Sequence, residues 1–449
     1  MNKLFGTDGI RGAANEGVLA VNELLRFSRA VATWLDRQNK DRLVVIGRDT
    51  RLSGKMMEAT LAGGFASVGY DVRVAGIVPT PAIALMVRAS GADLGIMISA
   101  SHNQFSDNGI KLFKSDGYKL TDEEEAEIEK IYAEPDSWKA LASGSAIGRV
   151  QADDQFGKSY SQFCASSLPQ HFSLRGMRVA LDTSNGAMSD CAPDLLRTLG
   201  AEVHVIHNHP DGININAGCG SQHTEDLAVL VREMEADVGI AFDGDGDRCI
   251  AVDEHGKELR GDQVLAICAL ALKKSGKLPA DSLVVTVMSN VGLHAAMQEA
   301  GIRVNICGVG DRNVMKEMIE CGATLGGEDS GHVIFHDFHT TGDGLITALQ
   351  LLRIIKDSDR PLSVLADCIS IFPQVMLNVE VVRKPELSSL KRLQNEVKRA
   401  EELLGDRGRV LIRYSGTESL CRVMVEGADK ALIDKLVADL ATVVRRETA

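Results

Sequence analysis

Three stretches of the chain share one pattern of hydrophobic and polar residues. Each begins with a short apolar run, passes through a small polar turn into an amphipathic segment that ends at a glycine, and enters a second β-branched run. The apolar runs are residues 42–47, 178–182 and 283–287, and the closing glycines are Gly69, Gly200 and Gly301. Because glycine is the common residue just past a helix end, each stretch predicts a strand, a helix and a strand. This alternation favours mainly parallel sheets in three related α/β domains.

The C-terminal part of the chain has a different pattern. Residues 374–381 alternate as a strand, a helix is expected from Pro385 to the glycine at 405, and two strands and a last helix follow. This order lacks the regular alternation of the earlier stretches and predicts a small, separate α+β domain. We place the domain boundaries near residues 150, 254 and 371. The expected domains are therefore 1–150, 151–253, 254–370 and 371–449.

Composition and charge narrow the class of protein. The 449 residues are 45% apolar and 25% charged, which is an ordinary globular mixture. The net charge of −13 repels phosphate backbones and anionic lipid, so we expect neither nucleic acid nor a membrane as partner. An anionic small molecule would need local arginine and lysine clusters to bind.

Cysteine usage indicates the compartment. The nine cysteines include no Cys-x-x-Cys pair, which argues against a disulfide framework and against a zinc site. No apolar run is long enough to cross a membrane. The opening residues MNKLFGTDG lack the pattern of a signal peptide. We therefore expect a cytoplasmic protein.

The sharpest chemical signal is the loop AFDGDGDRC at residues 241–249, which lies between two apolar runs. Its carboxylates Asp243, Asp245 and Asp247 would repel one another by about 3 kcal/mol per pair at a separation of about 5 Å and an effective dielectric near 20. A hard divalent cation such as Mg²⁺ or Ca²⁺ removes this repulsion. An EF-hand is excluded because Arg248 occupies the position that requires glycine, and a solvated surface loop is the alternative.

A second signal is the segment 98–113, where an apolar strand runs into ISASHNQFSDNG. Ser101 is expected at the carboxyl end of a strand, where parallel α/β sheets bind ligands. Adjacent side chains of an extended backbone point apart, so we do not expect a direct dyad of Ser101 with His102. Ser101 is either a nucleophile that uses a base from elsewhere or an ordinary turn serine.

Three weaker loops offer groups for an anion or a sugar. In RYSGTES (413–419), the backbone and hydroxyls of Ser415, Gly416 and Thr417 form a candidate phosphate nest, with Arg413 and Arg422 adding positive charge. GGEDSGH (326–332) carries Glu328, Ser330 and His332, which suit sugar hydroxyls or a plain surface turn. FGTDGIRG (5–12) holds Arg11 between glycines as a further anion-binding candidate. The glycine spacings of Rossmann and Walker motifs are absent.

Taken together and in this order, these loops resemble the α-D-phosphohexomutase superfamily over nearly the full length of the chain. The motifs are FGTDGIRG, SASHN (99–103) followed by DNGIK (107–111), DGDGDR (243–248), GGEDSGH and RYSGTES. The first motif and DNGIK favour the branch that acts on glucosamine phosphates over phosphomannomutase/phosphoglucomutase, which stays as the alternative. A non-enzymatic protein that binds a metal or a sugar phosphate is the alternative from another class.

The resemblance implies three tandem α/β domains with mixed, mainly parallel sheets and a TATA-binding-protein-like α+β domain around one cleft. It implies an isomerase that interconverts glucosamine 6-phosphate and glucosamine 1-phosphate through a phosphoserine and glucosamine 1,6-bisphosphate. The product would feed the synthesis of UDP-N-acetylglucosamine and the bacterial cell wall. The implied partner is a small sugar phosphate, and a homodimer stays open.

The resemblance also implies roles for single residues. Ser101 would carry the phosphoryl group, and one Mg²⁺ would be held by a phosphoserine oxygen and the three aspartates. Lys111 and His332 would transfer protons, while Arg11 and Arg248 would stabilise the moving charge. Glu328 and Ser330 would bind sugar hydroxyls. The non-reacting phosphate would be bound by Arg413, Ser415, Gly416, Thr417 and Arg422.

This chain departs from the usual pattern of the superfamily at four positions in or beside these motifs. They are Gln104, Asn313, Asp329 and Ser419. None of the four removes a group with an implied catalytic role. Asp329 adds negative charge beside the expected sugar site, where it could attract the ammonium group of glucosamine.

Overall fold

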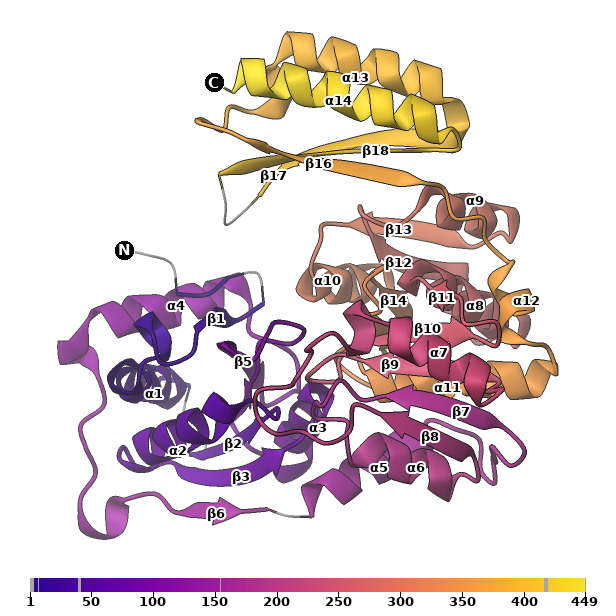
Figure 1. The fold of residues 1–449 in the computed structure, drawn as a ribbon. Coiled ribbons are helices and arrows are strands. Elements are labelled where there is room, and N and C mark those ends of the chain that lie inside the picture. The colour runs from indigo at the N-terminus through magenta and orange to yellow at the C-terminus, as the bar shows by residue number, and fades with distance from the viewer. Residues whose placement is uncertain (1–3, 7, 39–41, 154, 416–418, 449) are drawn as a thin grey trace. The chain divides into compact units, whose positions relative to one another are not determined.

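The computed structural model describes residues 4–6, 8–38, 42–153, 155–415 and 419–448 (Figure 1). The chain forms two compact units. The first consists of Met1–Val287 and Asn305–Ala366, and the second of Met288–Val304 and Asp367–Ala449. Each unit is described by itself.

The first sheet of the first unit has the strand order β1-β5-β4-β2-β3-β6. β2 pairs in parallel with β3 and β4, and β3 with β6, whereas β5 runs antiparallel to β4 and β1. Its strands are β1 (Ile10–Ala13), β2 (Leu43–Arg48), β3 (Asp71–Ile77), β4 (Leu94–Ile98), β5 (Asp107–Lys114) and β6 (Val150–Ala152). Its helices are α1 (Val21–Asp36), α2 (Leu52–Ala66), α3 (Thr80–Ser90) and α4 (Asp122–Ala133). A core that includes Phe27, Leu61 and Ile96 buries α1 and α2 against the sheet.

The second sheet has the order β11-β10-β9-β7-β8. β7 pairs in parallel with β8 and β9, and β9, β10 and β11 follow as antiparallel neighbours. Its strands are β7 (Arg178–Asp182), β8 (Glu202–Ile206), β9 (Val238–Phe242), β10 (Cys249–Asp253) and β11 (Glu258–Leu259). The helices in this part are α5 (Phe156–Ser166), α6 (Cys191–Thr198) and α7 (Glu225–Glu233).

The third sheet has the order β13-β12-β14-β15, with β12 parallel to β14 and β15 antiparallel to β14. Its strands are β12 (Ser282–Thr286), β13 (Arg303–Cys307), β14 (Leu325–Gly327) and β15 (Val333–Phe335). The helices in this part are α8 (Gly261–Lys274), α10 (Asp311–Cys321), α11 (Gly344–Ser358) and α12 (Leu362–Ala366). The three glycines that were expected to end helices, Gly69, Gly200 and Gly301, all have positive φ, at 85°, 96° and 68°. Their backbone conformation confirms the strand–helix–strand pattern read from the sequence.

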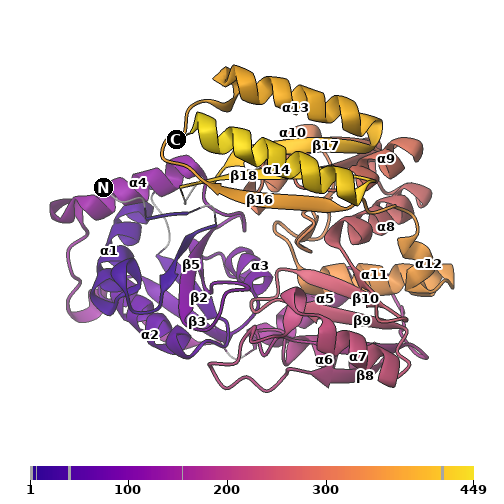
Figure 2. The ribbon, with the colours of Figure 1, turned by 45° about the horizontal axis from the view of Figure 1, so that its top comes forward.

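The second unit contains a three-stranded antiparallel sheet in the order β16-β18-β17. The elements of this unit are α9 (Val291–Glu299), β16 (Gln374–Glu380), α13 (Lys391–Leu404), β17 (Gly408–Tyr414), β18 (Leu420–Gly427) and α14 (Lys430–Glu447). Figures 1 and 2 show α13 and α14 on one face of this sheet, where Val423, Leu393 and Leu440 are buried. The expected fold class is therefore confirmed: three α/β sheets with mixed strand directions and a small α+β domain.

The expected start of the first C-terminal helix at Pro385 is wrong. Residues Leu387–Ser389 form a 3₁₀ turn, and α13 begins only at Lys391. The hydroxyls of Ser388 and Ser389 donate to the Glu386 side chain and carbonyl at 2.6 Å each. Such local side-chain bonds compete with helix formation, which explains the later start.

The described helices include none with both the length and the apolar character that a membrane-crossing helix needs. All nine cysteines are free thiols.

Candidate active site

Ser101 lies in the loop that follows β4, as expected, and its side chain is buried. Its Oγ donates to Asp243 Oδ2 at 2.6 Å. The backbone of Ser101 has a φ of 52°, a left-handed conformation that costs a non-glycine residue about 1–3 kcal/mol and that clusters at functional sites. The strained turn holds the hydroxyl against the aspartate loop.

The expectation that Ser101 and His102 point apart is wrong, because it assumed an extended backbone. In the left-handed turn, His102 Nδ1 lies 3.4 Å from Ser101 Oγ. Burial and the nearby Arg248 lower the pKa of His102 to about 4, so its imidazole is neutral and able to accept a hydrogen bond. The bond from Ser101 to Asp243 is nevertheless much the shorter of the two.

A single buried guanidinium holds the backbone of the serine loop. Arg51 follows β2, which is parallel to β4, so the two loops emerge at the same edge of the sheet. Arg51 donates to the carbonyls of Ser101 at 3.0 Å, Asn103 at 2.8 Å and Asp107 at 3.0 Å, and also to that of Gln104. Its Nε forms an ion pair with the buried Asp49 at 2.9 Å. Four carbonyls of one loop thus depend on one side chain.

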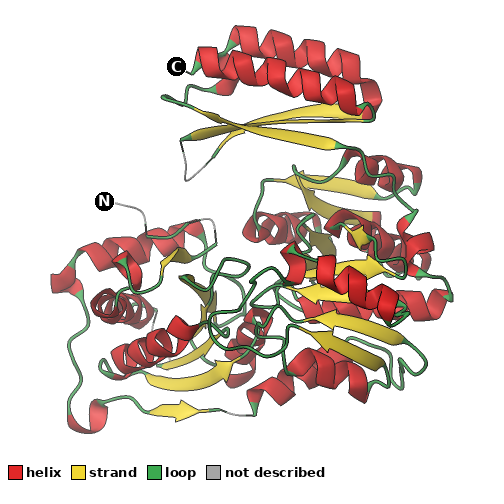
Figure 3. Cartoon of the chain, viewed as in Figure 1, coloured by secondary structure: helices red, strands yellow, loops and turns green. Residues whose placement is uncertain are grey.

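The second sheet contributes further contacts to the serine loop. Asn216 Nδ2 donates to the carbonyls of Ser101 at 2.8 Å and Asn103 at 3.0 Å. Gly244, between the aspartates, lies so close that an added Cβ would approach the Ser101 carbonyl oxygen to 2.7 Å. The serine loop and the aspartate loop therefore pack directly against each other, among the loops drawn green in Figure 3.

Asp243, Asp245 and Asp247 lie in the turn between β9 and β10, and all three are buried. One carboxylate oxygen from each lies within 4.8 Å of those of the other two. Burial and the charges of Asp247 and Asp245 raise the pKa of Asp243 well above its usual value. Among the described residues, Asp245 Oδ1 and Asp247 Oδ1 have no hydrogen-bond partner. Converging, incompletely satisfied oxygen donors of this kind fit a hard divalent cation.

Lys111, on β5, supplies positive charge to this group of carboxylates. Its Nζ donates to Asp245 at 2.8 Å and Asp247 at 2.9 Å and lies 3.4 Å from Asp8. Burial alone would lower the pKa of Lys111, but Asp245, Asp247 and Asp8 outweigh burial and hold it well above the usual value. Lys111 is therefore a buried cation that neutralises the aspartate loop.

His332 and Arg248 lie on the other side of Asp247. His332 Nδ1 is 3.6 Å from Asp247 Oδ1, and its Nε2 is 3.9 Å from Asp311. Burial would lower the pKa of His332, but the contact with Asp247 outweighs it and raises the pKa. The backbone N–H of Arg248 donates to Asp243 at 3.1 Å, and its Nε lies 3.9 Å from Asp247. The group thus combines a hydroxyl, carboxylates and three cationic or titratable side chains.

The remaining candidates of the first unit are Arg11, Glu328 and Ser330. Arg11 is exposed and pairs with Asp8 at 2.9 Å. Glu328 accepts a bond from the backbone N–H of Gly310 at 3.0 Å, and Ser330 is exposed. Asp329, beside the expected sugar site, forms an ion pair with Arg260. Its charge is therefore already balanced within the protein.

The second unit holds the candidates of the RYSGTES loop. Arg413 on β17 and Arg422 on β18 are directly opposite in the strand register. Burial and the charge of Arg422 lower the pKa of Arg413. Like charges facing each other across strands are unfavourable, and an anion bound between them would relieve the repulsion. Ser415 is buried, while Gly416 and Thr417 lie outside the described residues.

Comparison with known proteins assigns the family. Models of the phosphoglucomutase/phosphomannomutase family match in order: α/β/α domain I at residues 2–138, domain II at 158–256, domain III at 260–372 and the C-terminal domain at 376–443. The phosphoglucosamine mutase of Syntrophobacter fumaroxidans is 47% identical over 446 residues, which is 99% of both chains. That of Moorella thermoacetica is 48% identical over 443 residues, again 99% of both. The chain belongs to the phosphoglucosamine mutase family.

Solved structures show the same fold as this phosphoglucosamine mutase family member. A phosphoglucomutase/phosphomannomutase family protein from Burkholderia thailandensis aligns with a TM-score of 0.81 and 23% identity, over 99% of this chain and 97% of the other. N-acetylphosphoglucosamine mutase from Aspergillus fumigatus, solved with GlcNAc-6P and magnesium, aligns with a TM-score of 0.69 and 16% identity, over 99% and 96%. The full-length relatives and the family models confirm the expectation of a phosphohexomutase enzyme.

Sequence reasoning missed several residues that hold this site together. Arg51 and Asn216 bind the serine loop, and Asp8 links Lys111 with Arg11 and Lys119. The sequence did offer a reason to consider Arg51. The segment RDTR (48–51) comes at the end of an apolar run, as SHNQ (101–104) does. Its relevance depends on β2 and β4 being neighbours, which the sequence pattern does not specify.

We expect Arg51→Lys to lower kcat about 100-fold, since loss of the planar guanidinium fork releases the loop that positions Ser101. KM for the sugar phosphate should change much less, because Arg51 is fully buried and bonds only to protein groups. Steady-state kinetics of the purified variant measure both parameters.

Arg48→Lys is the matched control. Arg48 is the last residue of β2, three positions before Arg51, but it pairs with Glu58 at 3.1 Å and contacts the carbonyl of Asp49. Its kcat should stay close to that of the unmodified enzyme. Equal kcat values for the two variants would show that the guanidinium cradle does not position Ser101.

Proposed function

We propose that this chain interconverts glucosamine 6-phosphate and glucosamine 1-phosphate, with Ser101 as the carrier of the phosphoryl group. The observation that supports this role most strongly is the 2.6 Å bond that Ser101 Oγ makes with Asp243 inside a buried carboxylate cluster. The names of the full-length relatives supply the substrate.

We propose that Asp243, Asp245 and Asp247 hold one Mg²⁺ together with an oxygen of phosphorylated Ser101. Two observations support this assignment. Asp245 Oδ1 and Asp247 Oδ1 have no hydrogen-bond partner among the described residues, and all the donor atoms are oxygens. When bound, the ion neutralises phosphate charge and polarises the phosphoryl group. It would also share with Lys111 the task of balancing three buried carboxylates.

The proposed reaction proceeds in two transfers. The bond between Ser101 Oγ and phosphorus breaks as the sugar's O1 bonds to phosphorus, which gives glucosamine 1,6-bisphosphate. That intermediate turns around and returns its O6 phosphoryl group to Ser101. In each transfer the acceptor hydroxyl gives up a proton and the released oxygen takes one; our candidates are His332 for the base and Lys111, which the aspartates keep protonated, for the acid. Phosphoryl transfer depends chiefly on positioning and charge stabilisation, which the rigid serine loop and Arg11 and Arg248 would supply.

The substrate's other groups need separate contacts. We assign the sugar hydroxyls to Glu328 and Ser330, and the non-reacting phosphate to the second unit. There Arg413 and Arg422 present two facing positive charges beside Ser415. A site that binds phosphate through its charge can hold either phosphate group of the bisphosphate, and the proposed turn-around requires this. Gly416 and Thr417 complete this assignment from the sequence motif.

We also propose the domain limits 1–150, 151–253, 254–370 and 371–449 and a cytoplasmic location. The family matches begin at residues 2, 158, 260 and 376, and β11 still pairs with β10 beyond residue 254.

Comparison of kcat/KM for the 6-phosphates of glucosamine, glucose and mannose tests the substrate. We expect the glucosamine compound to be preferred by at least tenfold. A preference for glucose or mannose would assign the chain to phosphoglucomutase/phosphomannomutase activity instead.

Intact-mass analysis tests the carrier role. We expect one phosphoryl group on Ser101 that is lost on incubation with excess glucosamine 6-phosphate. A protein that binds the sugar phosphate but never exchanges a phosphoryl group would be a binding protein and not a mutase.

A further inference from the structure

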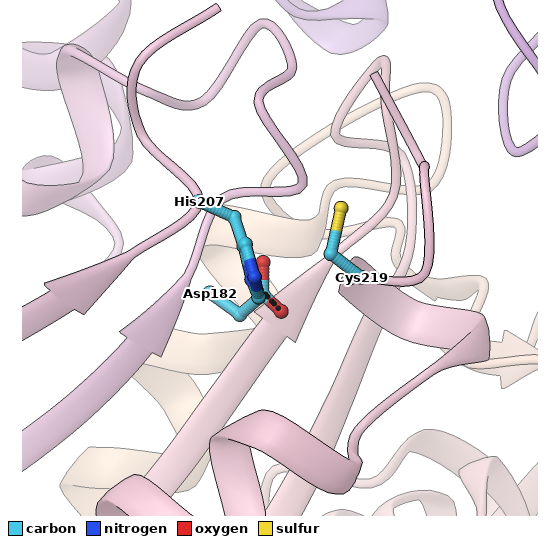
Figure 4. Close-up of side chains that lie close together, drawn as sticks. All are labelled: Asp182, His207 and Cys219. Carbon is cyan, nitrogen blue, oxygen red and sulfur yellow. Dashed lines mark hydrogen bonds and ion pairs between the residues drawn. The ribbon is translucent and has the colours of Figure 1, made fainter. Parts of the chain in front are cut away.

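A second group of ligand-type side chains lies at the carboxyl edge of the second sheet (Figure 4). Asp182 is the last residue of β7, His207 follows β8, and Cys219 directly precedes the 3₁₀ turn Gly220–Gln222. His207 Nδ1 lies 2.9 Å from Asp182 Oδ2, and one donor atom from each of the three residues lies within 4.8 Å of the others. Asp182 and Cys219 are buried, and the His207 side chain is 25% exposed.

We propose that Asp182, His207 and Cys219 form a binding site for a borderline divalent cation of the Zn²⁺ type, separate from the aspartate triad. The two sites differ in donor chemistry. Three carboxylates favour a hard ion such as Mg²⁺, whereas a thiolate and an imidazole with one carboxylate favour zinc. Three protein ligands leave a fourth tetrahedral position, which water can reach beside the partly exposed imidazole.

The surroundings of this site orient its ligands. Asp182 accepts bonds from the backbone N–H groups of Ser184 at 2.8 Å and Gly220 at 2.9 Å, which fix its carboxylate. The second ring nitrogen of His207, Nε2, lies 3.4 Å from Asp226. A carboxylate behind the non-ligating nitrogen is the usual outer partner of a zinc-bound histidine, and it leaves Nδ1 directed at the site.

The charges balance with and without the ion. Without it, a hydrogen bond joins His207 Nδ1–H to Asp182, and Cys219 is a thiol. Binding replaces the thiol proton of Cys219 and the proton on His207 Nδ1, so we expect affinity to increase with pH.

The position of the site gives it a structural consequence. The loop 207–219 also carries Asn216, whose side chain bonds to the Ser101 carbonyl at 2.8 Å. An ion bound by His207 and Cys219 would tie both ends of this loop to β7. The lack of a Cys-x-x-Cys pair argued against zinc in the sequence, but spacing rules do not detect ligands contributed by three separate segments.

Cobalt(II) is the probe for this site, because a thiolate bound to Co²⁺ gives a near-ultraviolet charge-transfer band. The full chain is titrated with Co²⁺ in excess Mg²⁺, which occupies the oxygen site. We expect one equivalent to produce the band, with release of protons on binding in buffered calorimetry. Cys219→Ser should remove the band, and His207→Gln should weaken binding about 100-fold.

Cys321→Ser is the control, since Cys321 is a half-buried thiol whose Sγ donates to the Met318 carbonyl at 3.9 Å, away from Asp182 and His207 in the sequence. It should titrate like the unmodified protein, and thermal unfolding verifies that each variant is folded. Absence of the band in the unmodified protein, or an unchanged band in folded Cys219→Ser, would overturn the proposal. These readouts do not involve turnover, so they are independent of the proposed function.

Discussion

Replacing Ser101 with alanine is expected to abolish turnover, whereas Arg248→Ala should retain a trace of activity. Without Oγ the proposed carrier atom of the phosphoryl group is lost. An arginine that only stabilises the moving charge is worth about 10³–10⁵ in rate, so its loss leaves a measurable remainder. Coupled assays at high enzyme concentration separate a trace from background, and intact mass shows whether each variant becomes phosphorylated.

Ser106→Ala is the control for this comparison. Ser106 belongs to the same loop but is exposed, and its carbonyl, which the substitution keeps, bonds to the backbone of Ala14. Its turnover should match that of the unmodified enzyme. Comparable residual activity in Ser101→Ala and Arg248→Ala would reject the covalent role of Ser101.

The fold was predictable from the sequence where one local rule decided the structure. Gly69, Gly200 and Gly301 each end a helix-containing stretch with a positive φ, and the apolar runs before them form β2, β7 and β12. The rule failed at Pro385, where serine hydroxyls bind the nearby Glu386 and delay the helix. Side-chain competition of this kind depends on rotamers that a hydrophobic pattern does not contain.

The candidate site was predictable to the extent that its residues lie in loops after strands. Ser101 and the aspartates were found in this way, and the structure brings them into contact. Arg51, Asn216 and the Asp182 cluster were missed because their importance depends on which strands are neighbours. Strand order is a long-range property, and short motifs carry little information about it.

Lys111→Met is expected to destabilise the enzyme by about 3–5 kcal/mol at neutral pH without divalent ions, because it leaves buried carboxylates without their cation. Lys111 is 1% exposed and bonds to Asp245 and Asp247 at 2.8 and 2.9 Å. Burial would raise the pKa of Asp247, but Lys111, together with His332 and Arg248, outweighs burial and holds the pKa well below the usual value. Urea unfolding of the two proteins in a chelating buffer gives the difference.

The dependence of this stability loss on pH and on Mg²⁺ distinguishes the electrostatic cause from a loss of packing. A depressed aspartate pKa stabilises the fold above the unfolded-state value, near 4, and this contribution is lost only as pH falls through the lower folded-state pKa. The deficit of Lys111→Met should therefore be largest at neutral pH and shrink below about pH 4, as its carboxylates protonate. Millimolar Mg²⁺ should stabilise Lys111→Met more than the unmodified enzyme.

Lys114→Met is the control on the same strand: its ion pairs, at 3.6 and 3.8 Å, are partly exposed, so it should cost less than about 1 kcal/mol. Equal stability of the two variants at pH 7 would show that Lys111 does not neutralise the aspartate loop.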